Sequence, residues 1–498
     1  MSADIETVPQ RKGRKMRKEM SNTRKKQIAI GVEDFKKIID KGGYFVDKTL
    51  MIQSLIESQA MVTLFMRPRR FGKTLNQFML RRFFEDERTR SGERIDNGDL
   101  FDGLKVTACG EEVLQHQQQY PVIFLSLKSA KQPNFEEAYK KICGAIAEEF
   151  RRHQYLLAGN SLADDQKIMF QKIMTGQADY SAYNDALKFL SECLWQYHGK
   201  NTMILIDEYD VPLENAYLEG FYDQMIPFIR SLFESALKTN PYLEKSVITG
   251  CLRISKESIF TGLNNFKVYS ADDVQYDEEF GFTTEDVKKI LAAYNQQEHF
   301  EEMKEWYDGY HFGNADIYCP WNVINYIDDL MSDSKAKPKA YWINSSGNDL
   351  VKRFIDKADT TTRDEIEQLI TGKAVQKRIR LDLTYDEIDN SAENVWSVLF
   401  TTGYLTRLGE SENGMYKLVI PNKEVLEVFI LQIREWFDRF VANDQASTKK
   451  INCGFLEGKV EDIEQELTMF LGETISVLDT KARNEEKEIF YQGILIGI

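Results

Sequence analysis

The chain has little of what secreted, metal-binding or membrane-spanning proteins need. Its six cysteines are scattered over 498 residues and form no Cys-x-x-Cys pair. This spacing argues against a zinc knuckle and a disulfide framework, and it favours reduced, mostly buried thiols. The five histidines show no metal-ligand spacing either. No apolar run approaches the roughly 18 residues of a membrane span, and no apolar segment of a signal peptide follows the N-terminus. We therefore expect a cytoplasmic protein that does not associate with membranes.

The chain also lacks an excess of positive charge. Its net charge of −15 argues against a basic surface that coats the whole protein and binds nucleic acid. Residues 11–26 are the local exception, with nine Lys or Arg against one Glu. We expect residues 1–27 to form a basic, disordered tail, and a nucleic-acid-binding arm is the alternative.

What is present indicates a folded protein of several domains. Hydrophobic residues make up 42% of the chain and aromatic residues 12%, and the length suggests about two to four domains. Short apolar runs at 60–66, 121–127, 202–210 and 245–250 alternate with stretches of helical spacing. Buried strands that alternate with helices predict an α/β domain, in which helices cover both faces of a parallel sheet.

The stretch "FMRPRRFGKTLNQFML" (65–80) follows the first of these strands and opens a helix. Gly72, Lys73 and Thr74 end it as a phosphate-binding P-loop ends, but Arg67 stands where the G-x-x-x-x-G-K-[ST] pattern has its first glycine. In a P-loop, backbone N–H groups hold the phosphates, Lys73 would reach the β- and γ-phosphate oxygens, and Thr74 would bind Mg²⁺. A basic turn without a nucleotide is the competing interpretation.

A second motif favours the nucleotide site. The strand "TMILIDEYD" (202–210) ends in Asp207 and Glu208. A strand-end Asp of a P-loop ATPase holds Mg²⁺, and the neighbouring Glu would polarise the attacking water. One further strand lies between the two motifs in the sequence. This spacing allows their strands to be non-adjacent, as in ASCE-type P-loop ATPases, while the alternative is a solvated acidic strand end.

Polar residues at the end of the fourth strand add candidates. Thr249 would sense the γ-phosphate, and Arg253 would stabilise charge on the transferring phosphoryl group. A helix cap or a surface ion pair is the alternative for Arg253. Arg69 and Arg70 would either contact phosphates or pair with acids that follow the third strand.

The rest of the chain predicts appendages to this domain. We place the P-loop domain at 28–274, a mainly helical domain at 275–390, and a winged-helix-like α+β unit at 391–440. The last of these rests on a helix, a hairpin and a second helix between 397 and 430. Residues 441–498 would form C-terminal helices. Aromatic residues between 306 and 321 could stack nucleic-acid bases, but at their density they more often form a core.

Several motifs together resemble those of a bacterial family, the predicted AAA-ATPase-like proteins. They span residues 28 to 440 and include "YFVDKT" (44–49), "RPRRFGKT" (67–74), "YPVIFLSLK" (120–128), "LIDEYDVPLENA" (205–216), "TGCLRISKESIFTGLNN" (249–265), "EWYDGYHFG" (305–313), "YCPWNVINYI" (318–327), "YWINSSGNDL" (341–350) and "TTGYLTRL" (401–408). The R-P-R-R-F-G-K-[ST] loop is this family's usual form, so Arg67 is not a degenerate glycine.

The resemblance implies an ATP-binding protein and a Mg²⁺-dependent ATPase. The implied nucleotide-binding residues are Arg67, Arg69, Arg70, Phe71, Gly72, Lys73, Thr74, Asp207 and Thr249. The implied metal ligands are Thr74 and Asp207, and the implied catalytic residues are Glu208 and Arg253. Many members carry a C-terminal PD-(D/E)xK nuclease domain. We expect that domain to be missing from this chain, and we expect no nuclease activity.

Two hypotheses of different classes remain at this point. One is an ATPase that a nucleic acid or a protein partner triggers, in a chain that also forms homo-oligomers. The other is a nucleotide-dependent switch or scaffold that does not hydrolyse ATP and that associates with DNA or a protein.

Overall fold

The computed structural model describes residues 27–252, 266–342, 349–356, 360–381, 383, 387–388, 391–409 and 413–443. The basic tail at 1–26, Arg253 and the C-terminal segment 444–498 lie outside the described residues, and so do the predictions made for them. The chain divides into two compact units. The first comprises 1–301, 311–337 and 381–390, and the second comprises 302–310, 338–380 and 391–498.

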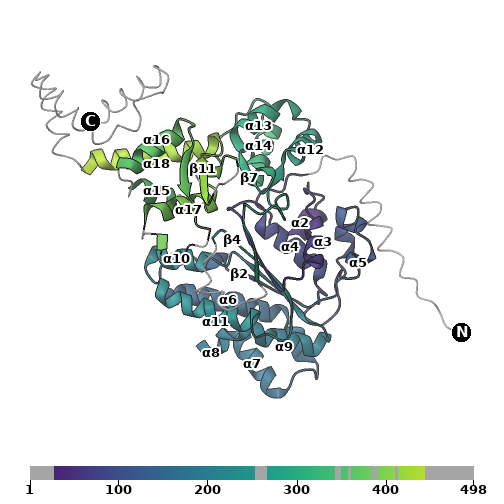
Figure 1. The fold of residues 1–498 in the computed structure, drawn as a ribbon. Helices are drawn as coiled ribbons and strands as arrows, with labels where there is room; N and C mark the ends of the chain where they lie inside the picture. Colours follow the sequence, from purple (N-terminus) through teal and green to yellow (C-terminus); the bar gives the residue numbers. More distant parts are fainter. Residues whose placement is uncertain are drawn as a thin grey trace, which may run out of the picture. The chain divides into compact units, whose positions relative to one another are not determined.

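A parallel sheet of five strands, counted over the described residues, forms the centre of the first unit (Figure 1). Its strands are β1 (Val62–Met66), β2 (Val122–Ser126), β3 (Thr202–Asp207), β4 (Leu243–Gly250) and β5 (Phe266–Tyr269). They lie in the order β2-β3-β4-β1-β5, and each neighbouring pair is parallel. The four strands predicted from apolar runs are confirmed, and β4 lies between the strands that precede the two motifs. The short β5 was not predicted.

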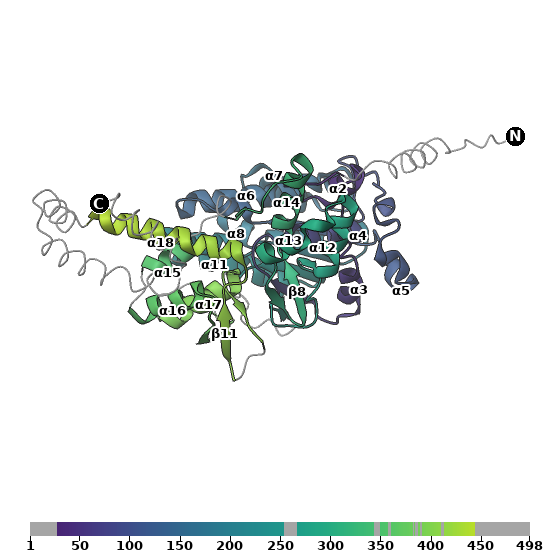
Figure 2. The ribbon, with the colours of Figure 1, turned by 90° about the horizontal axis from the view of Figure 1, so that it is seen from above.

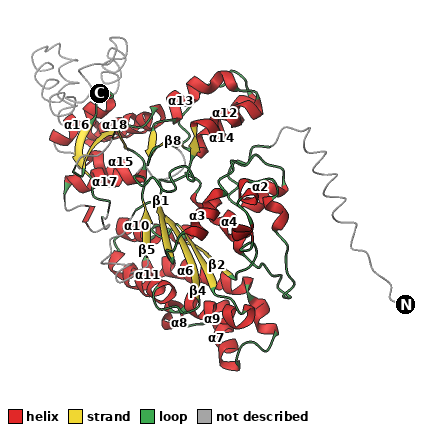
Figure 3. Ribbon diagram, turned by 45° about the vertical axis from the view of Figure 1, so that its right-hand side comes forward, coloured by secondary structure: helices red, strands yellow, loops and turns green. Residues whose placement is uncertain are grey.

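Helices cover both faces of this sheet, as the alternating pattern predicted (Figure 3). Helix α4 packs on β2, β3 and β4 on one face, and the layer of α6, α9 and α11 packs against these strands on the other. The helices of the first unit are α2 (Phe35–Asp40), α3 (Leu50–Glu57), α4 (Lys73–Phe84), α5 (Glu111–Leu114), α6 (Phe135–Arg152), α7 (Asp164–Thr175), α8 (Tyr180–Asn184), α9 (Ala186–His198), α10 (Val211–Glu219), α11 (Tyr222–Leu237), α12 (Thr284–Tyr294) and α14 (Pro320–Ser332).

The first unit also holds, apart from Tyr310, a small second sheet in the order β6-β8-β7, which the sequence did not predict. Its strands are β6 (Phe282–Thr283), β7 (Tyr310–Phe312) and β8 (Ala315–Tyr318). Thr283 caps the start of α12, because its side chain accepts a hydrogen bond from the backbone N–H of Asp286. The aromatic residues Tyr307, Tyr310, Phe312 and Tyr318 are buried, which agrees with a role in packing.

The second unit contains α13 (Phe300–Tyr307) for most of its length and a separate α+β assembly. That assembly comprises α15 (Asp349–Asp356), α16 (Thr360–Ile370), β9 (Val375–Arg378), α17 (Ala392–Thr402), β10 (Thr406–Arg407), β11 (Met415–Val419) and α18 (Lys423–Asn443). The strands form an antiparallel sheet in the order β10-β11-β9. Figure 2 shows α18 alongside α15 and α16, which it contacts. The predicted succession of helix, hairpin and helix is confirmed.

Candidate nucleotide-binding site

The candidate loop connects β1 to α4 without an intervening element. Gly72 precedes the first residue of α4 and has a φ of +83°, and Arg70 has a φ of +71°. Both values lie in the left-handed region, which glycine adopts freely and arginine rarely does. These two residues turn the chain sharply, so that the first N–H groups of α4 lie at the end of β1. An N-terminus presented in this way is suited to anion binding.

Lys73 is buried under the loop, with 3% of its surface exposed. Its Nζ donates hydrogen bonds to the carbonyls of Arg67 and Pro68 at 3.0 and 2.9 Å, and to Cys251 Sγ at 3.3 Å. Burial alone would lower the pKa of Lys73, but Cys251, Glu208 and Asp210 raise it. Because burial raises the pKa of the Cys251 thiol to about 12, the thiol is neutral near pH 7. The two carboxylates therefore keep this ammonium group charged.

Asp207 joins four elements through its carboxylate. Thr74 Oγ1 donates to Asp207 Oδ2 at 2.9 Å, and Thr249 Oγ1 donates to Oδ1 at 2.9 Å. Ser126 Oγ, at the end of β2, donates to Oδ2 at 3.4 Å. The side chain is fully buried. Burial and then the charge of Glu208 raise the pKa of Asp207 above its ordinary value, despite the hydrogen bonds from both threonines. The structure thus brings together Lys73, Thr74, Asp207 and Thr249.

Glu208 follows Asp207 in a strained conformation. Its φ is +53°, in the left-handed region, and its side chain is half-buried. Its backbone N–H makes a long hydrogen bond of 3.5 Å to Thr249 Oγ1. A backbone outlier of this kind costs about 1–3 kcal/mol and is found most often at functional sites. The strain supports a functional hypothesis for Glu208, whose catalytic role stays a prediction.

Arg67 differs from the other loop residues in where its side chain is engaged. It is fully buried, and its guanidinium donates to the carbonyls of Met66, Tyr269, Ser270 and Tyr276. It also lies over the rings of Phe280 and Phe312, at 5.2 and 5.3 Å. These contacts tie the loop to the chain that follows β5. What Arg67 offers near the loop is its backbone carbonyl, which Lys73 contacts, and a phosphate role for its side chain stays a prediction.

The other two loop arginines have different surroundings. Arg69 forms an ion pair with Glu214 on α10, which begins just after the acids of β3. This contact corresponds to the pairing that the sequence offered as an alternative to phosphate binding. Arg70 lies with its guanidinium carbon 5.6 Å from the ring centre of Trp321. Phe71 is fully buried, and its ring centre lies 5.2 Å from that of Phe312.

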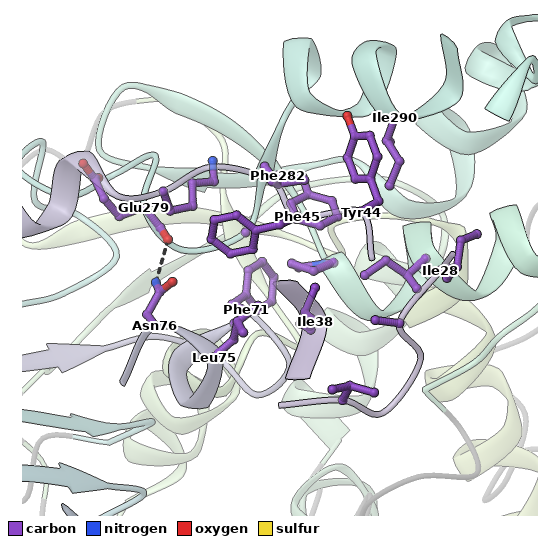
Figure 4. Close-up of a pocket in the computed structure, with 18 residues that line it drawn as sticks. Ile28, Ile38, Tyr44, Phe45, Phe71, Leu75, Asn76, Glu279, Phe282 and Ile290 are labelled. Atoms are coloured by element: carbon purple, nitrogen blue, oxygen red, sulfur yellow. Dashed lines mark hydrogen bonds between the residues drawn. The ribbon is translucent and has the colours of Figure 1, made fainter. Parts of the chain in front are cut away.

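A mainly apolar pocket of about 100 Å³ lies beside Gly72 (Figure 4). Its walls come from the N-terminal segment, the start of α4, the region around β6, and α14. They comprise Ile28, Ala29, Val32, Ile38, Tyr44, Phe45, Val46, Lys48, Phe71, Gly72, Leu75, Asn76, Glu279, Gly281, Phe282, Ile290, Pro320 and Ile324. Asn76 Nδ2 donates to the backbone carbonyl of Glu279 at 2.9 Å, which joins two of the walls.

Sequence reasoning missed the pocket, and it also missed Ser126, Asp210 and Cys251. Ser126 could have been found, because it closes a predicted strand and carboxyl ends of parallel strands meet at one edge of a sheet. The pocket residues are ordinary apolar residues from separate segments, so no pattern marks them. In the described part of the chain, no group of three or more His, Cys, Asp or Glu could hold a metal ion. No described helix is long and apolar enough to cross a membrane.

Comparison with known proteins agrees with this geometry. Residues 29–260 match the model of a family described as predicted AAA-ATPase. Over these residues the chain is similar to that family. The chain is also similar to a protein described as "Uncharacterized protein in vnfD 5'region" from Azotobacter chroococcum mcd 1, with 25% identity over 408 residues, 80% of this chain and 68% of the relative. The relative's name assigns no activity. Similarity to the AAA-ATPase-like family therefore supports nucleotide binding in general.

Proposed function

We propose that the chain binds Mg²⁺-ATP at the β1–α4 loop and hydrolyses it. The observation that carries this proposal is the 2.9 Å hydrogen bond from Thr74 Oγ1 to Asp207 Oδ2. It joins two motifs whose residues are 133 positions apart. Two ligands of a nucleotide-bound cation must lie close together, as Thr74 and Asp207 do. A basic turn without a nucleotide does not require this contact.

The donor set around Asp207 fits Mg²⁺. This ion takes oxygen ligands, keeps several waters, and is usually bound by one or two protein groups together with the phosphates of the substrate. The Thr74 hydroxyl and the Asp207 carboxylate supply two such oxygens, and the raised pKa of Asp207 reflects a buried acid whose charge a cation would stabilise. When bound, the ion would neutralise charge on the β- and γ-phosphate oxygens.

The remaining residues of the site take defined roles in this proposal. The N–H groups of the loop and of the start of α4 bind phosphate oxygens, and Lys73 leaves the loop carbonyls to contact the β- and γ-phosphates. Glu208 polarises the attacking water, and Thr249 senses the γ-phosphate through its contact with Asp207. The catalytic role of Arg253 and the phosphate contacts of Arg69 and Arg70 belong to the same proposal.

The apolar pocket would hold the purine base. It lies beside Gly72, which is the end of the loop nearest the phosphates, and it presents Phe45, Phe71 and Phe282. Flat apolar walls with a few polar groups are what a base-binding site requires. The strand order β2-β3-β4-β1-β5 supports an ASCE-type sheet, because β4 separates the two motif strands.

The described part of the second unit gives little support to nucleic-acid binding. We propose that residues 391–440, which comprise α17, the β10–β11 hairpin and the start of α18, form a winged-helix-like unit. Residues 28–274 would form the P-loop domain and residues 275–390 a mainly helical domain. Helix α17 of the winged-helix-like unit carries no Lys or Arg, whereas a helix that enters a DNA groove needs phosphate and base contacts from such residues. A nucleic-acid or protein trigger, homo-oligomers and a cytoplasmic location stay predictions.

Phosphate release from Mg²⁺-ATP, with and without duplex DNA, tests the proposed function. We expect Lys73→Ala to abolish ATP binding and Glu208→Gln to keep binding while lowering turnover about 100-fold or more. Lys238→Ala and Glu219→Gln, both exposed, are matched controls and should leave both quantities unchanged. Lys73-dependent binding without phosphate release would instead identify a nucleotide-dependent switch. A wild-type protein that binds no ATP would contradict the proposal.

A further inference from the structure

The turn after β3 is hydrogen-bonded to the end of β4 through Tyr209 and Asp210, which have no role in the mechanism proposed above. Asp210 Oδ2 accepts hydrogen bonds from the backbone N–H groups of Cys251 and Leu252, at 2.7 and 2.9 Å. The Tyr209 hydroxyl donates to the carbonyl of Leu252 at 2.5 Å, and the Tyr209 N–H donates to the carbonyl of Thr249 at 3.1 Å. Both side chains are buried, Tyr209 completely. We call residues 249–252 the β4 tail.

Asp210 departs from what its local position predicts. It is the residue before α10, where an Asp side chain usually accepts a hydrogen bond from the first turn of the helix. Here the side chain makes no such cap, and its Oδ2 instead faces the β4 tail. The carboxylate is buried, and burial raises the pKa of Asp210 to about 6. A buried acid that bonds the end of another strand, and not the first turn of its own helix, breaks the local pattern. Such exceptions are expected at functional sites.

Gly250 explains why the tail lies so close to the turn. A Cβ atom added there would lie 2.4 Å from Tyr209 Cε1 and 2.8 Å from Asp210 Oδ1. These distances are shorter than any ordinary contact between such atoms, so a side chain at this position would push the tail away from the turn. Only glycine permits the close approach.

The other side of the β4 tail contacts the phosphate-binding loop. The backbone N–H of Arg67 donates to the carbonyl of Gly250 at 3.1 Å, and Lys73 Nζ lies 3.3 Å from Cys251 Sγ. Thr249, the first residue of the tail, donates to Asp207. The tail therefore lies between the loop and the acids, and its position determines where Thr249 and Cys251 meet Asp207 and Lys73.

We propose that Tyr209 and Asp210 are positioning residues for ATP hydrolysis. They hold the β4 tail so that the hydrogen bonds of Thr249 with Asp207 and of Cys251 with Lys73 are kept. This inference rests on the proposed function, and it assigns to these two residues a larger effect on turnover than on nucleotide affinity. Asp210→Asn replaces a charged acceptor by a neutral amide oxygen, which binds the N–H groups of Cys251 and Leu252 more weakly. The tail would therefore be held less firmly.

The first test separates kcat from KM. We expect Asp210→Asn to lower kcat about 10-fold or more, since small misplacements of reacting groups have effects of this order, while KM and the ATP Kd stay within about 3-fold. Gly250→Ala should act in the same way. The double variant should be no worse than the worse single variant, because both changes release the same segment. Asp223→Asn, an exposed acid on α11, is the matched control.

The second test does not depend on turnover. Cys251 has only 8% of its surface exposed, so iodoacetamide should label it slowly in the wild type. Mass spectrometry of the Cys251 peptide should show labelling about 10-fold faster in Asp210→Asn, because a buried thiol that is exposed to solvent only transiently is modified in proportion to the open population. If Asp210→Asn does not fold, Tyr209→Phe, which loses only the bond to Leu252, should show both effects at a smaller size.

The outcomes distinguish this inference from the proposed function. Unchanged kcat in an active Asp210→Asn protein, or unchanged labelling of Cys251, would overturn the positioning role. A wild-type protein that binds ATP but releases no phosphate would contradict hydrolysis alone. The labelling rate of Tyr209→Phe, which keeps the charge beside Cys251 unchanged, would then still decide whether the turn holds the β4 tail.

Discussion

Charged side chains are buried at both ends of the central sheet, but the groups that they contact differ between the two ends. At the amino end of β2, Arg152 pairs with Glu85 and Glu149 and also donates to the carbonyl of Val122. At the carboxyl ends of β1, β3 and β4, the carboxylates of Asp207 and Asp210 accept hydrogen bonds from neutral hydroxyl and N–H groups. Each buried acid at the first end has a cation at hydrogen-bond distance, whereas among the described residues Asp207 and Asp210 at the other end have none.

The pKa values of the acids record this difference. Burial alone would raise the pKa of Glu149, but the charge of Arg152 holds it well below its usual range. Near it, hydrogen bonds from His198 and Arg88 lower the pKa of Asp86 to about 2 despite its burial. At the other end, burial raises the pKa of both Asp207 and Asp210. Acids with raised pKa values in a dry site are typical of functional positions, whereas paired acids are typical of structural ones.

Removing the cation at the amino end should produce the largest loss of stability. Arg152→Met removes the arginine that Glu85 and Glu149 share, although Glu85 keeps its ion pair with Arg81. We expect the free energy of unfolding to fall by about 3 kcal/mol. ATP affinity of the folded protein should not change, because the site is at the other end of the sheet. Urea unfolding and ATP titration measure the two quantities. Lys140→Met, which breaks an exposed pair with Glu136, is the control, and equal losses in both variants would refute the contrast.

Removing charge at the carboxyl end should have the reverse effect on stability. Asp207→Asn eliminates a buried acid of raised pKa, so we expect the free energy of unfolding to stay the same or to rise by about 1 kcal/mol. Mg²⁺-dependent ATP binding should be lost in the same protein. Glu149→Gln is the matched change at the amino end and should destabilise the fold without affecting binding. A large loss of stability in Asp207→Asn would show that the two ends do not differ in this respect.

The dependence of stability on pH should differ in sign between the two ends. The folded pKa values of Asp86 and Glu87 are lowered to about 2, so their stabilising contribution is present above their unfolded values and lost as pH falls toward 2. The folded pKa of Asp210 is raised to about 6 from 3.8, so its contribution is present below 3.8 and lost as pH rises through 6.

Urea unfolding across pH measures both effects. The difference in stability between the wild type and an Asp86→Asn, Glu87→Gln double variant should shrink between pH 4.5 and pH 2. The stability of Asp210→Asn relative to the wild type should increase between pH 4 and pH 6. Parallel curves for all three proteins would contradict the assigned pKa directions.

Local patterns in the sequence carried the main features of the fold. Continuous apolar runs identified β1 to β4, because a strand buried on both faces needs apolar residues at successive positions. They missed β5 (Phe266–Tyr269), since four residues with a lysine among them do not form such a run. They also missed the β6-β8-β7 sheet, whose strands are too short for any periodicity to be seen.

The loop arginines show where local reasoning ends. In the sequence, Arg67, Arg69 and Arg70 are three cations next to a phosphate-binding signature, and nothing in the stretch itself tells them apart. In the structure, Arg67 donates to carbonyls more than 200 positions away, at Ser270 and Tyr276, and Arg69 pairs with Glu214 on α10. Each of these partners comes from a segment that only the folded chain brings near the loop.

The sequence by itself thus determined the strand–loop–helix that can bind phosphate, the acids that end β3, and the alternation that makes the sheet parallel. These features follow from properties of a few consecutive residues, such as apolar runs, glycine at a left-handed turn and acids at a strand end. Only the tertiary structure decided that Asp207 contacts Thr74 and that apolar segments form a pocket beside Gly72. It also decided that the Asp210 side chain bonds the β4 tail and does not cap α10. Those contacts join residues far apart in the chain, and their partners are selected by packing, which no short stretch of sequence encodes.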